Sequence, residues 1–276
     1  MIDVTDLRIP VRQLAWATDL HMNFLRHGSL AAFCESLVQS PADAIAITGD
    51  ISDGLHLEAH LTCIAQAVSK PIFVLLGNHD RYHTTFADAE QQMQRLSVSH
   101  PHVHRLTGRE IVELSPHTAL VGVDGWADGQ SGSGPKSPIV LNDTLCIRDL
   151  AALPRAAQWM KMAEWARDSA EKVKPALDEA MASFREVILL THVPPLPEAT
   201  WHEGRMSEPD FLPHFCNAWL GEVIRETCAK HYEAKLMVLC GHTHSEGVHH
   251  ENNLTVLTAG TVYGSPRIDR VIPILS

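Results

Sequence analysis

The nine residues IAITGDISD, positions 45–53, place two carboxylates directly after an uninterrupted apolar run. A run of this length, bounded by turn residues, is typical of a strand that is buried on both faces. Asp50 and Asp53 would then lie on the loop at the carboxyl end of that strand. Because ligands bind at this edge of open α/β sheets, the stretch predicts a buried parallel strand that ends in a polar site.

The same arrangement recurs four times along the chain, each time with an apolar run that ends in residues able to bind metals. The four runs are AWATDLH at 15–21, VLLGNHD at 74–80, VILLTH at 187–192 and MVLCGHTH at 237–244. If these strands share a sheet, their carboxyl ends bring the polar side chains to one edge. We therefore expect one composite site rather than five unrelated turns.

Hydrophobic periodicity in the first eighty residues predicts alternating strands and helices. Strands are expected at 13–18, 44–48 and 72–76, with amphipathic helices at about 30–38 and 57–68 between them. Ser29 is a candidate cap for the first helix. This β-α-β-α-β order indicates a parallel sheet flanked by helices.

The rest of the chain predicts a mixture of hairpin, helices and further strands. Helices are expected at 85–96, 154–183 and 213–231, and strands at 109–114, 117–123, 187–190, 236–240, 254–257 and 271–275. The closely spaced pair of strands at 109–114 and 117–123 indicates an antiparallel hairpin, and Pro175 is expected to kink or break its helix. Within a single domain spanning 1–276, we interpret about residues 127–183 as a partly helical insertion or cap.

Composition limits the class of protein. With 276 residues, 45% of them hydrophobic, the chain can bury a sizeable core. A net charge of −11 argues against a nucleic-acid partner, and the apolar runs are too short to cross a membrane. Six cysteines without a CxxC pair indicate free thiols in a reducing compartment, and residues 1–6 lack a signal-peptide pattern. A cytoplasmic protein is therefore expected.

Seven side chains at or just after the ends of apolar runs are candidate metal ligands. They are Asp19, His21, Asp50, Asn78, His192, His242 and His244. Oxygen and imidazole donors without thiolate favour manganese, iron or zinc. Two metals about 3.5–4 Å apart need a bridging oxygen donor, which a carboxylate can supply and a protonated imidazole cannot.

Each motif taken singly also has a structural explanation. Asp19 and His21 could form a turn, Gly49-Asp50 could end a strand, and Gly77-Asn78 could be turn chemistry. Their joint occurrence in this order makes coincidence improbable.

In sequence, Asp-x-His, Gly-Asp, Gly-Asn-His-Asp, His and Gly-His-x-His resemble the motifs of the calcineurin-like metallophosphoesterase superfamily, from Asp19 to His244. The resemblance implies a four-layered α/β/β/α sandwich with two central mixed sheets. It also implies a centre of two divalent or mixed-valence metal ions, with manganese expected to serve in vitro. One metal would be held by Asp19, His21, Asp50 and His244, and the other by Asp50, Asn78, His192 and His242. His79 would be the catalytic histidine near the leaving group, and Asp80 its orienting partner.

A hydrolase of small-molecule phosphoesters is the function that these residues favour. Two dications would offset the phosphate charge and acidify a bridging water, and His79 would act as general acid. Phosphodiesters are slightly preferred, by analogy with the superfamily, because the motif ends in Asp80 and the arginines of protein phosphatases are absent. The alternatives are a phosphomonoesterase or protein phosphatase of the same superfamily, or a non-catalytic scaffold with the same fold.

Several residues near the motifs have two possible roles. Arg81 could contact phosphate or lie on the surface, and Trp126 could stack on a ring of the substrate or pack at the rim. Asp53 could simply complete a turn. His56, His60 and His83 could line the site, although solvated positions are the simpler expectation.

Overall fold

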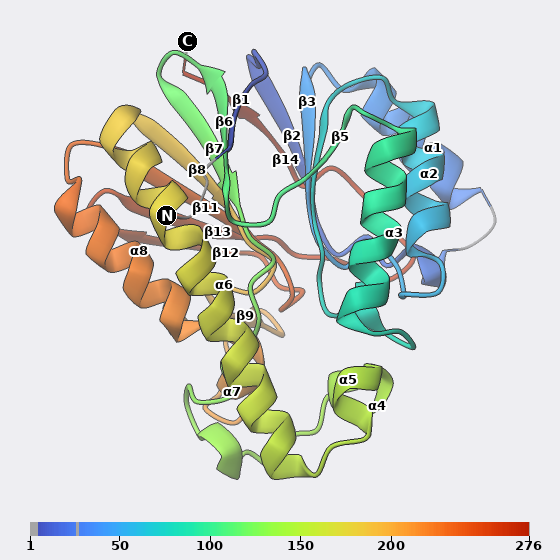
Figure 1. Ribbon diagram of the computed structural model, residues 1–276, viewed down its shortest axis with the longest axis vertical. Coiled ribbons are helices and arrows are strands. Elements are labelled where there is room, and N and C mark those ends of the chain that lie inside the picture. The colour runs from blue at the N-terminus through green and yellow to red at the C-terminus, as the bar shows by residue number, and fades with distance from the viewer. Residues whose placement is uncertain (1–4, 26–27, 276) are drawn as a thin grey trace.

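The computed structural model describes residues 5–25 and 28–275 of the chain, and it contains two central sheets flanked by helices (Figure 1). The four layers are three helices, a five-stranded sheet, a seven-stranded sheet and two further helices. The predicted α/β/β/α sandwich is confirmed.

The first sheet contains the predicted β-α-β-α-β unit. Its order is β14-β2-β3-β4-β5, parallel except for the edge strand β14. The strands are β2 (Gln13–Ala17), β3 (Ala44–Thr48), β4 (Ile72–Leu75), β5 (Val103–Arg105) and β14 (Arg270–Pro273). The helices α1 (Ser29–Gln39), α2 (Leu57–Ala67) and α3 (Phe86–Ser99) cover its outer face (Figure 1).

The second sheet is built around four parallel strands, β7, β8, β11 and β13. Its order is β1-β6-β7-β8-β11-β13-β12, and β6 and β7 form the predicted antiparallel hairpin. The strands are β1 (Thr5–Arg8), β6 (Glu110–Ser115), β7 (Thr118–Gly122), β8 (Glu186–Leu190), β11 (Lys235–Cys240), β12 (Gly247–Glu251) and β13 (Leu254–Thr258). Helices α6 (Arg155–Ser183) and α8 (Ala218–Lys230) cover its outer face.

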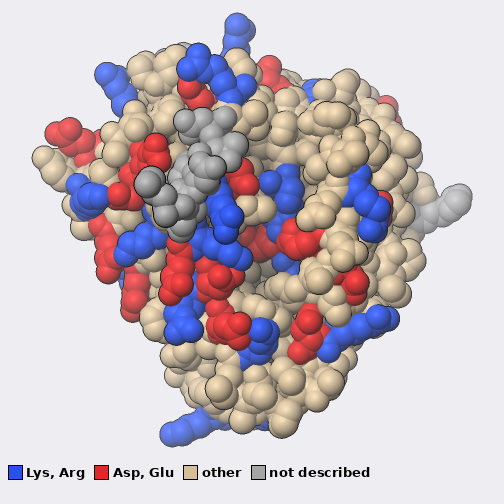
Figure 2. All heavy atoms as spheres, in the orientation of Figure 1, with Lys and Arg blue, Asp and Glu red and all other residues tan. Residues whose placement is uncertain are grey.

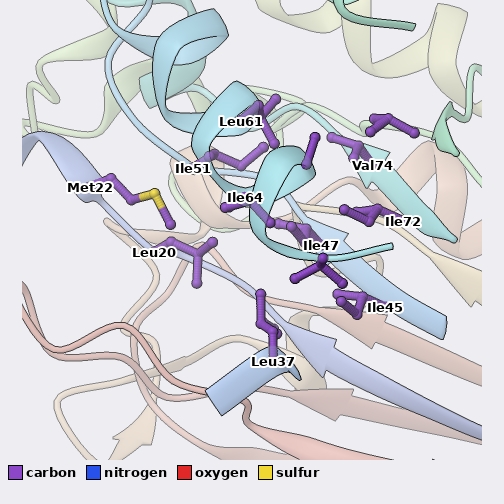
Figure 3. Packing of buried hydrophobic residues seen from close by; sticks show 14 of the residues in the cluster. Leu20, Met22, Leu37, Ile45, Ile47, Ile51, Leu61, Ile64, Ile72 and Val74 are labelled. Atoms are coloured by element: carbon purple, nitrogen blue, oxygen red, sulfur yellow. The ribbon is translucent and has the colours of Figure 1, made fainter. Parts of the chain in front are cut away.

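Side chains that point alternately to the two faces of each strand fill the three spaces between the four layers. In β3, Ile45 and Ile47 face the helices and pack against Leu61 and Ile64 of α2 (Figure 3). The intervening residues Ala44 and Ala46 face the other sheet and belong to the cluster between the two sheets. Because successive side chains point to opposite faces, a strand between two layers must be apolar throughout.

A fourth apolar cluster lies beyond the sheets, at the end where α6 begins (Figure 1). It contains buried residues of α6 such as Trp159 and Met162, together with Ile147 and Leu150. The short helices α4 (Asp143–Cys146) and α5 (Arg148–Ala151) belong to this region. We use the name cap for residues 127–166, the first part of the segment of about 127–183 that was expected to be an insertion or cap. The later part of α6, including Val173 and Leu177, packs on the seven-stranded sheet.

Three local expectations differ from the structure. Pro175 was expected to kink or break its helix, and the break is wrong because α6 continues through Pro175; buried packing of Val173 and Leu177 offsets the hydrogen bond that proline cannot donate. Gly28, not Ser29, is the N-cap of α1. The helix expected at 213–231 is divided into α7 (Leu212–Phe215) and α8, because the Asn217 side chain accepts from the Leu220 N–H and so starts a new helix.

None of the described helices combines the length and apolar character needed to span a bilayer. The signal-peptide expectation concerns residues 1–6, and residues 1–4 of these lie outside the described residues.

Candidate metal centre

The loops after five strands from both sheets meet at one place. β2, β3 and β4 of the first sheet and β8 and β11 of the second each carry a candidate ligand two or three residues beyond their last residue. Two groups of donor atoms result, each with all atoms within 4.8 Å of one another. They are Asp19, His21, Asp50 and His244, and Asp50, His192 and His242. The expected composite site is therefore assembled in space, with Asp50 shared by both groups, although its strands belong to two sheets and not to one.

Backbone conformation at these residues is unusual. Five of the seven candidate ligands have φ between 44° and 69°, in the left-handed region that residues other than glycine seldom adopt. The five are Asp19, His21, Asp50, His242 and His244. Backbone bonds between neighbouring loops hold two of these turns, from Asp19 N–H to Gly49 O and from His21 N–H to Asp50 O. Such conformations cost about 1–3 kcal/mol each and cluster at functional sites.

Two glycines are required because ligand carboxylates approach their backbone. A Cβ atom at Gly77 would overlap Asp50 Oδ1, and one at Gly241 would overlap Asp19 Oδ2. These close approaches explain why a glycine directly precedes the ligand in both motifs.

In the first group, the donor atoms face one another across a small space. His21 Nε2 lies 3.0 Å from His244 Nε2, which lies 3.4 Å from Asp19 Oδ1. Asp50 Oδ2 lies 3.9 Å from His21 Nε2. Two imidazole nitrogens and two carboxylate oxygens thus surround one position.

The second group uses the other oxygen of Asp50. Its Oδ1 lies 3.4 Å from His192 Nε2. Asn78 Oδ1 lies 3.0 Å from both His192 Nε2 and His242 Nδ1. The two oxygens of Asp50 therefore face different groups, as a bridging carboxylate requires.

The outer ring nitrogens of His192 and His242 donate hydrogen bonds, and these bonds determine that the lone pairs of the inner nitrogens face the second group. His192 Nδ1–H donates to Thr48 O, and His242 Nε2–H donates to His214 O, each at 2.8 Å. In neutral rings, the inner nitrogens then present lone pairs to the carbonyl oxygen of Asn78. Three acceptors at this separation repel one another unless a cation lies between them, so this donor set fits a metal ion.

Burial keeps the imidazoles in the neutral form that binds metals. It lowers the pKa of His21 to about 2 and that of His192 to about 3. Burial, and then the nearby charge of Asp19, raise the pKa of Asp50. A dication between these groups would have the opposite effect on Asp50, because it favours the carboxylate.

His79 lies at the edge of the centre rather than among the ligands. Its backbone N–H donates to Asp50 Oδ1 at 2.8 Å, and its ring stacks on that of Tyr82 with centroids 4.2 Å apart. Its Nε2 lies 3.9 Å from Asp50 Oδ2. Burial lowers the pKa of His79 to about 4. His79 also lines a cavity of about 190 Å³ that opens beside Asp50.

The Asp80 carboxylate does not make the predicted hydrogen bond to the His79 ring. Its Oδ1 accepts the N–H groups of Ile51 and Ser52 at 2.8 and 2.9 Å, and its Oδ2 accepts the Gly77 N–H at 2.8 Å. Within the described ranges, His79 Nδ1 has no hydrogen-bond partner. Burial raises the pKa of Asp80 to about 7. The Asp80 carboxylate therefore joins the loops that carry Asp50 and Asn78.

Arg81 and Trp126 are both buried behind the centre. Arg81 donates to Asp124 Oδ2 at 2.6 Å and to Gly77 O at 2.5 Å, and its guanidinium lies over the Phe86 ring. It is neither a surface residue nor free to bind phosphate. Trp126 packs edge-on against Trp165, which excludes it as an exposed stacking platform.

The remaining histidines near the motifs lie outside the cavity. His56 bonds to Asp53 at 2.7 Å, His60 bonds to Ser52 at 2.8 Å, and His83 is exposed. Asp53 accepts the His56 N–H at 3.0 Å and so completes a turn, which is the simpler of its two possible roles.

Eight of the described residues that line this cavity had not been predicted as part of the site: Tyr82, Leu141, Asn142, Asp143, His202, Phe215, Thr243 and Tyr263. Tyr263 lies against His21, with ring centroids 4.4 Å apart. Asp143 reaches the site from the cap, two residues after the short apolar run Ile139-Val140-Leu141, which does not form a strand. Local pattern alone could not have identified it.

Comparisons with known proteins agree with this geometry. The model of the calcineurin-like phosphoesterase family matches residues 13–246. A search of the curated proteins gives no significant match.

Similar solved structures include phosphopantetheinyl hydrolase (PptH) from Mycobacterium tuberculosis, with a TM-score of 0.65 and 13% identity over 94% of this chain and 96% of that one. A dimetal phosphatase from Danio rerio has a TM-score of 0.58 and 12% identity, over 93% and 89% of the two chains. TT1561 of Thermus thermophilus has a TM-score of 0.54 and 17% identity, over 91% and 89%. At these identities the structural matches show the fold alone. Because the family model spans most of the chain, the protein belongs to the calcineurin-like phosphoesterase family and is a metal-dependent phosphoester hydrolase.

Proposed function

We propose that the enzyme hydrolyses small phosphodiesters at a centre of two metal ions. Asp19, His21, Asp50 and His244 would hold the first ion, and Asp50, Asn78, His192 and His242 the second. The two inward-facing donor groups that share Asp50 support this assignment. Manganese, iron and zinc fit these donors, and manganese is the ion that we would supply in vitro.

The charge of the cavity supports a preference for diesters. The part of its lining that the structure describes includes Asp143 and contains no lysine or arginine. The carboxylates of Asp19, Asp50 and Asp143 offset three of the four positive charges of two dications. A diester brings about one negative charge to this site, whereas a phosphomonoester brings about 1.5 to 2. The less charged substrate therefore fits the site better.

Asp50 and His79 would have different roles in hydrolysis. When bound, two dications offset the charge of the phosphate oxygens and supply a nucleophile at neutral pH. Asp50 keeps the two half-sites at a fixed separation. His79 lines the cavity beside Asp50, where the charge of a bound phosphate favours its protonated form. From Nε2 it can donate a proton to the leaving oxygen.

A comparison of two substrates tests this proposal. In the presence of Mn²⁺, kcat/KM for a bis-aryl phosphate should exceed that for the corresponding mono-aryl phosphate. Asp143→Asn keeps the shape of the side chain but removes its charge, and should reduce that preference by on the order of tenfold. A wild-type enzyme that favours the monoester would contradict the diester assignment. Two bound metals without hydrolysis of either compound would favour the scaffold alternative.

Partners and location are part of the same proposal. Positive and negative side chains are interspersed on the face drawn in Figure 2, and no basic patch of the kind that binds nucleic acid stands out there. All six cysteines are free, which supports a reducing compartment such as the cytoplasm. A small-molecule phosphodiester is therefore the substrate that we propose.

A further inference from the structure

Asp143 connects the cap to a proposed ligand of the second metal. It is the first residue of α4 and is only 4% exposed. Its Oδ1 accepts two hydrogen bonds, from Asn78 Nδ2 at 2.8 Å and from the Tyr82 hydroxyl at 2.6 Å. One carboxylate oxygen of the cap thus accepts hydrogen bonds from two residues of the loop that follows β4.

The bond to Asn78 determines which end of that amide faces the metal position. With Nδ2 held by Asp143, Oδ1 must point toward His192 and His242, from which it lies 3.0 Å. If the amide rotated by half a turn, an N–H donor would face the cation, and such a group cannot act as a ligand. Asp143 therefore selects the metal-binding orientation of Asn78.

The bond to Tyr82 fixes the surface on which His79 lies. The Tyr82 ring stacks on the His79 imidazole at a centroid distance of 4.2 Å and an interplanar angle of 27°. Because Asp143 anchors the Tyr82 hydroxyl, the carboxylate that orients a metal ligand also holds the neighbour of the proposed acid.

Further bonds hold α4 and α5 on the same loop. The His83 N–H donates to Cys146 O at 2.8 Å, and the Arg148 N–H donates to Thr84 O at 3.0 Å. The Phe86 N–H donates to Asp149 Oδ2 at 2.8 Å. Buried Ile147 packs in the same cluster as Tyr82. These contacts place Asp143 accurately enough to orient Asn78.

We propose that the cap is part of the second metal half-site and that Asp143 is its positioning residue, acting on the metal through Asn78 and on His79 through Tyr82. This inference rests on the proposed function, which places Asn78 among the ligands of the second ion. The cap would therefore do more than cover the cavity.

Titration of the full-length chain with Mn²⁺ alone, followed by equilibrium dialysis and metal analysis, tests the proposal. In Asp143→Ala, affinity for the second ion should fall by about 10–100-fold, whereas affinity for the first should stay near the wild-type value. Asp143→Asn retains an oxygen acceptor at the same place and should restore most of the affinity. Asp149→Ala is the matched control, because it removes a bond between cap and loop that does not reach a metal ligand.

The outcomes separate this inference from the function on which it rests. Wild-type affinity for both ions in Asp143→Ala would overturn the positioning role, even if the wild type hydrolyses diesters. An equal loss of the second ion in Asp149→Ala would also overturn it, because docking of the cap alone would then explain the effect. Selective loss in Asp143→Ala, with no diester hydrolysis by the wild type, would support the positioning role and contradict the proposed substrate. With an active enzyme, Asp143→Ala at saturating Mn²⁺ should lower kcat more than it raises KM.

Discussion

Asp50 Oδ1 and His192 Nε2 lie 3.4 Å apart, although one follows β3 in the five-stranded sheet and the other follows β8 in the seven-stranded sheet. The other oxygen of Asp50 faces His21, which follows β2. A single carboxylate thus lies between candidate ligands supplied by the two sheets. The candidate centre depends on how the sheets pack together, not on either sheet alone.

His79 should affect turnover without affecting metal content. Because His79 lies beside the two donor groups and not within them, His79→Ala should still bind two Mn²⁺ ions. Loss of the proposed acid should reduce kcat by about 10²–10⁴-fold. Metal analysis and steady-state kinetics on the same preparation check both statements. His83→Ala, at an exposed position four residues away, should match the wild type, and metal loss in His79→Ala would instead make His79 structural.

Gly77 should not tolerate a methyl group. A Cβ atom there would overlap Asp50 Oδ1 and the Asp50 backbone nitrogen, so Gly77→Ala should displace the shared carboxylate and lower the affinity for both ions. The comparison variant is Gly204→Ala, which meets no atom within 4 Å and carries only the cost of a left-handed backbone, about 1–2 kcal/mol. Calorimetric Mn²⁺ titration distinguishes them, and normal metal binding by Gly77→Ala would show that the loop can move aside.

Metal binding should stabilise the folded chain, because the converging acceptors form a site only in the native structure. At a free Mn²⁺ concentration of 100 times Kd, the free energy of unfolding should rise by about 2.7 kcal/mol. This corresponds to an increase in Tm of about 5 °C or more. Thermal melts with Mn²⁺ and with a chelator measure the difference. Identical melting curves in the two conditions would mean that the site does not bind the ion.

Periodicity and strand ends were sufficient to predict the first β-α-β-α-β unit and the convergence of the candidate ligands, whereas the four-layered sandwich was predicted from the family resemblance. Each of β2, β3 and β4 is an apolar run that ends in a polar turn, and parallel strands bring such turns to one edge. The position of Asp50 between the two donor groups agrees with the bridging role that the resemblance implied.

Contacts made through the cap could not be predicted in this way. Asp143 meets Asn78 across 65 residues of sequence, and neither hydrophobic periodicity nor motif spacing specifies how a short helix docks on a distant loop. The expected hydrogen bond between Asp80 and the His79 ring is also missing because of a contact between distant loops. Backbone N–H groups of two tightly turned loops needed an acceptor, and the buried Asp80 carboxylate satisfies three of them.

The number of Mn²⁺ ions bound per chain in wild type and in Asp50→Asn tests the shared carboxylate most directly. Equilibrium dialysis with metal analysis should find two ions in the wild type and fewer in the variant, with turnover reduced by about 100-fold or more. Asp53→Asn should behave as wild type, because that carboxylate bonds to His56 of the same turn and to no candidate metal ligand. Two ions and wild-type turnover in Asp50→Asn would contradict the account of a centre bridged by Asp50.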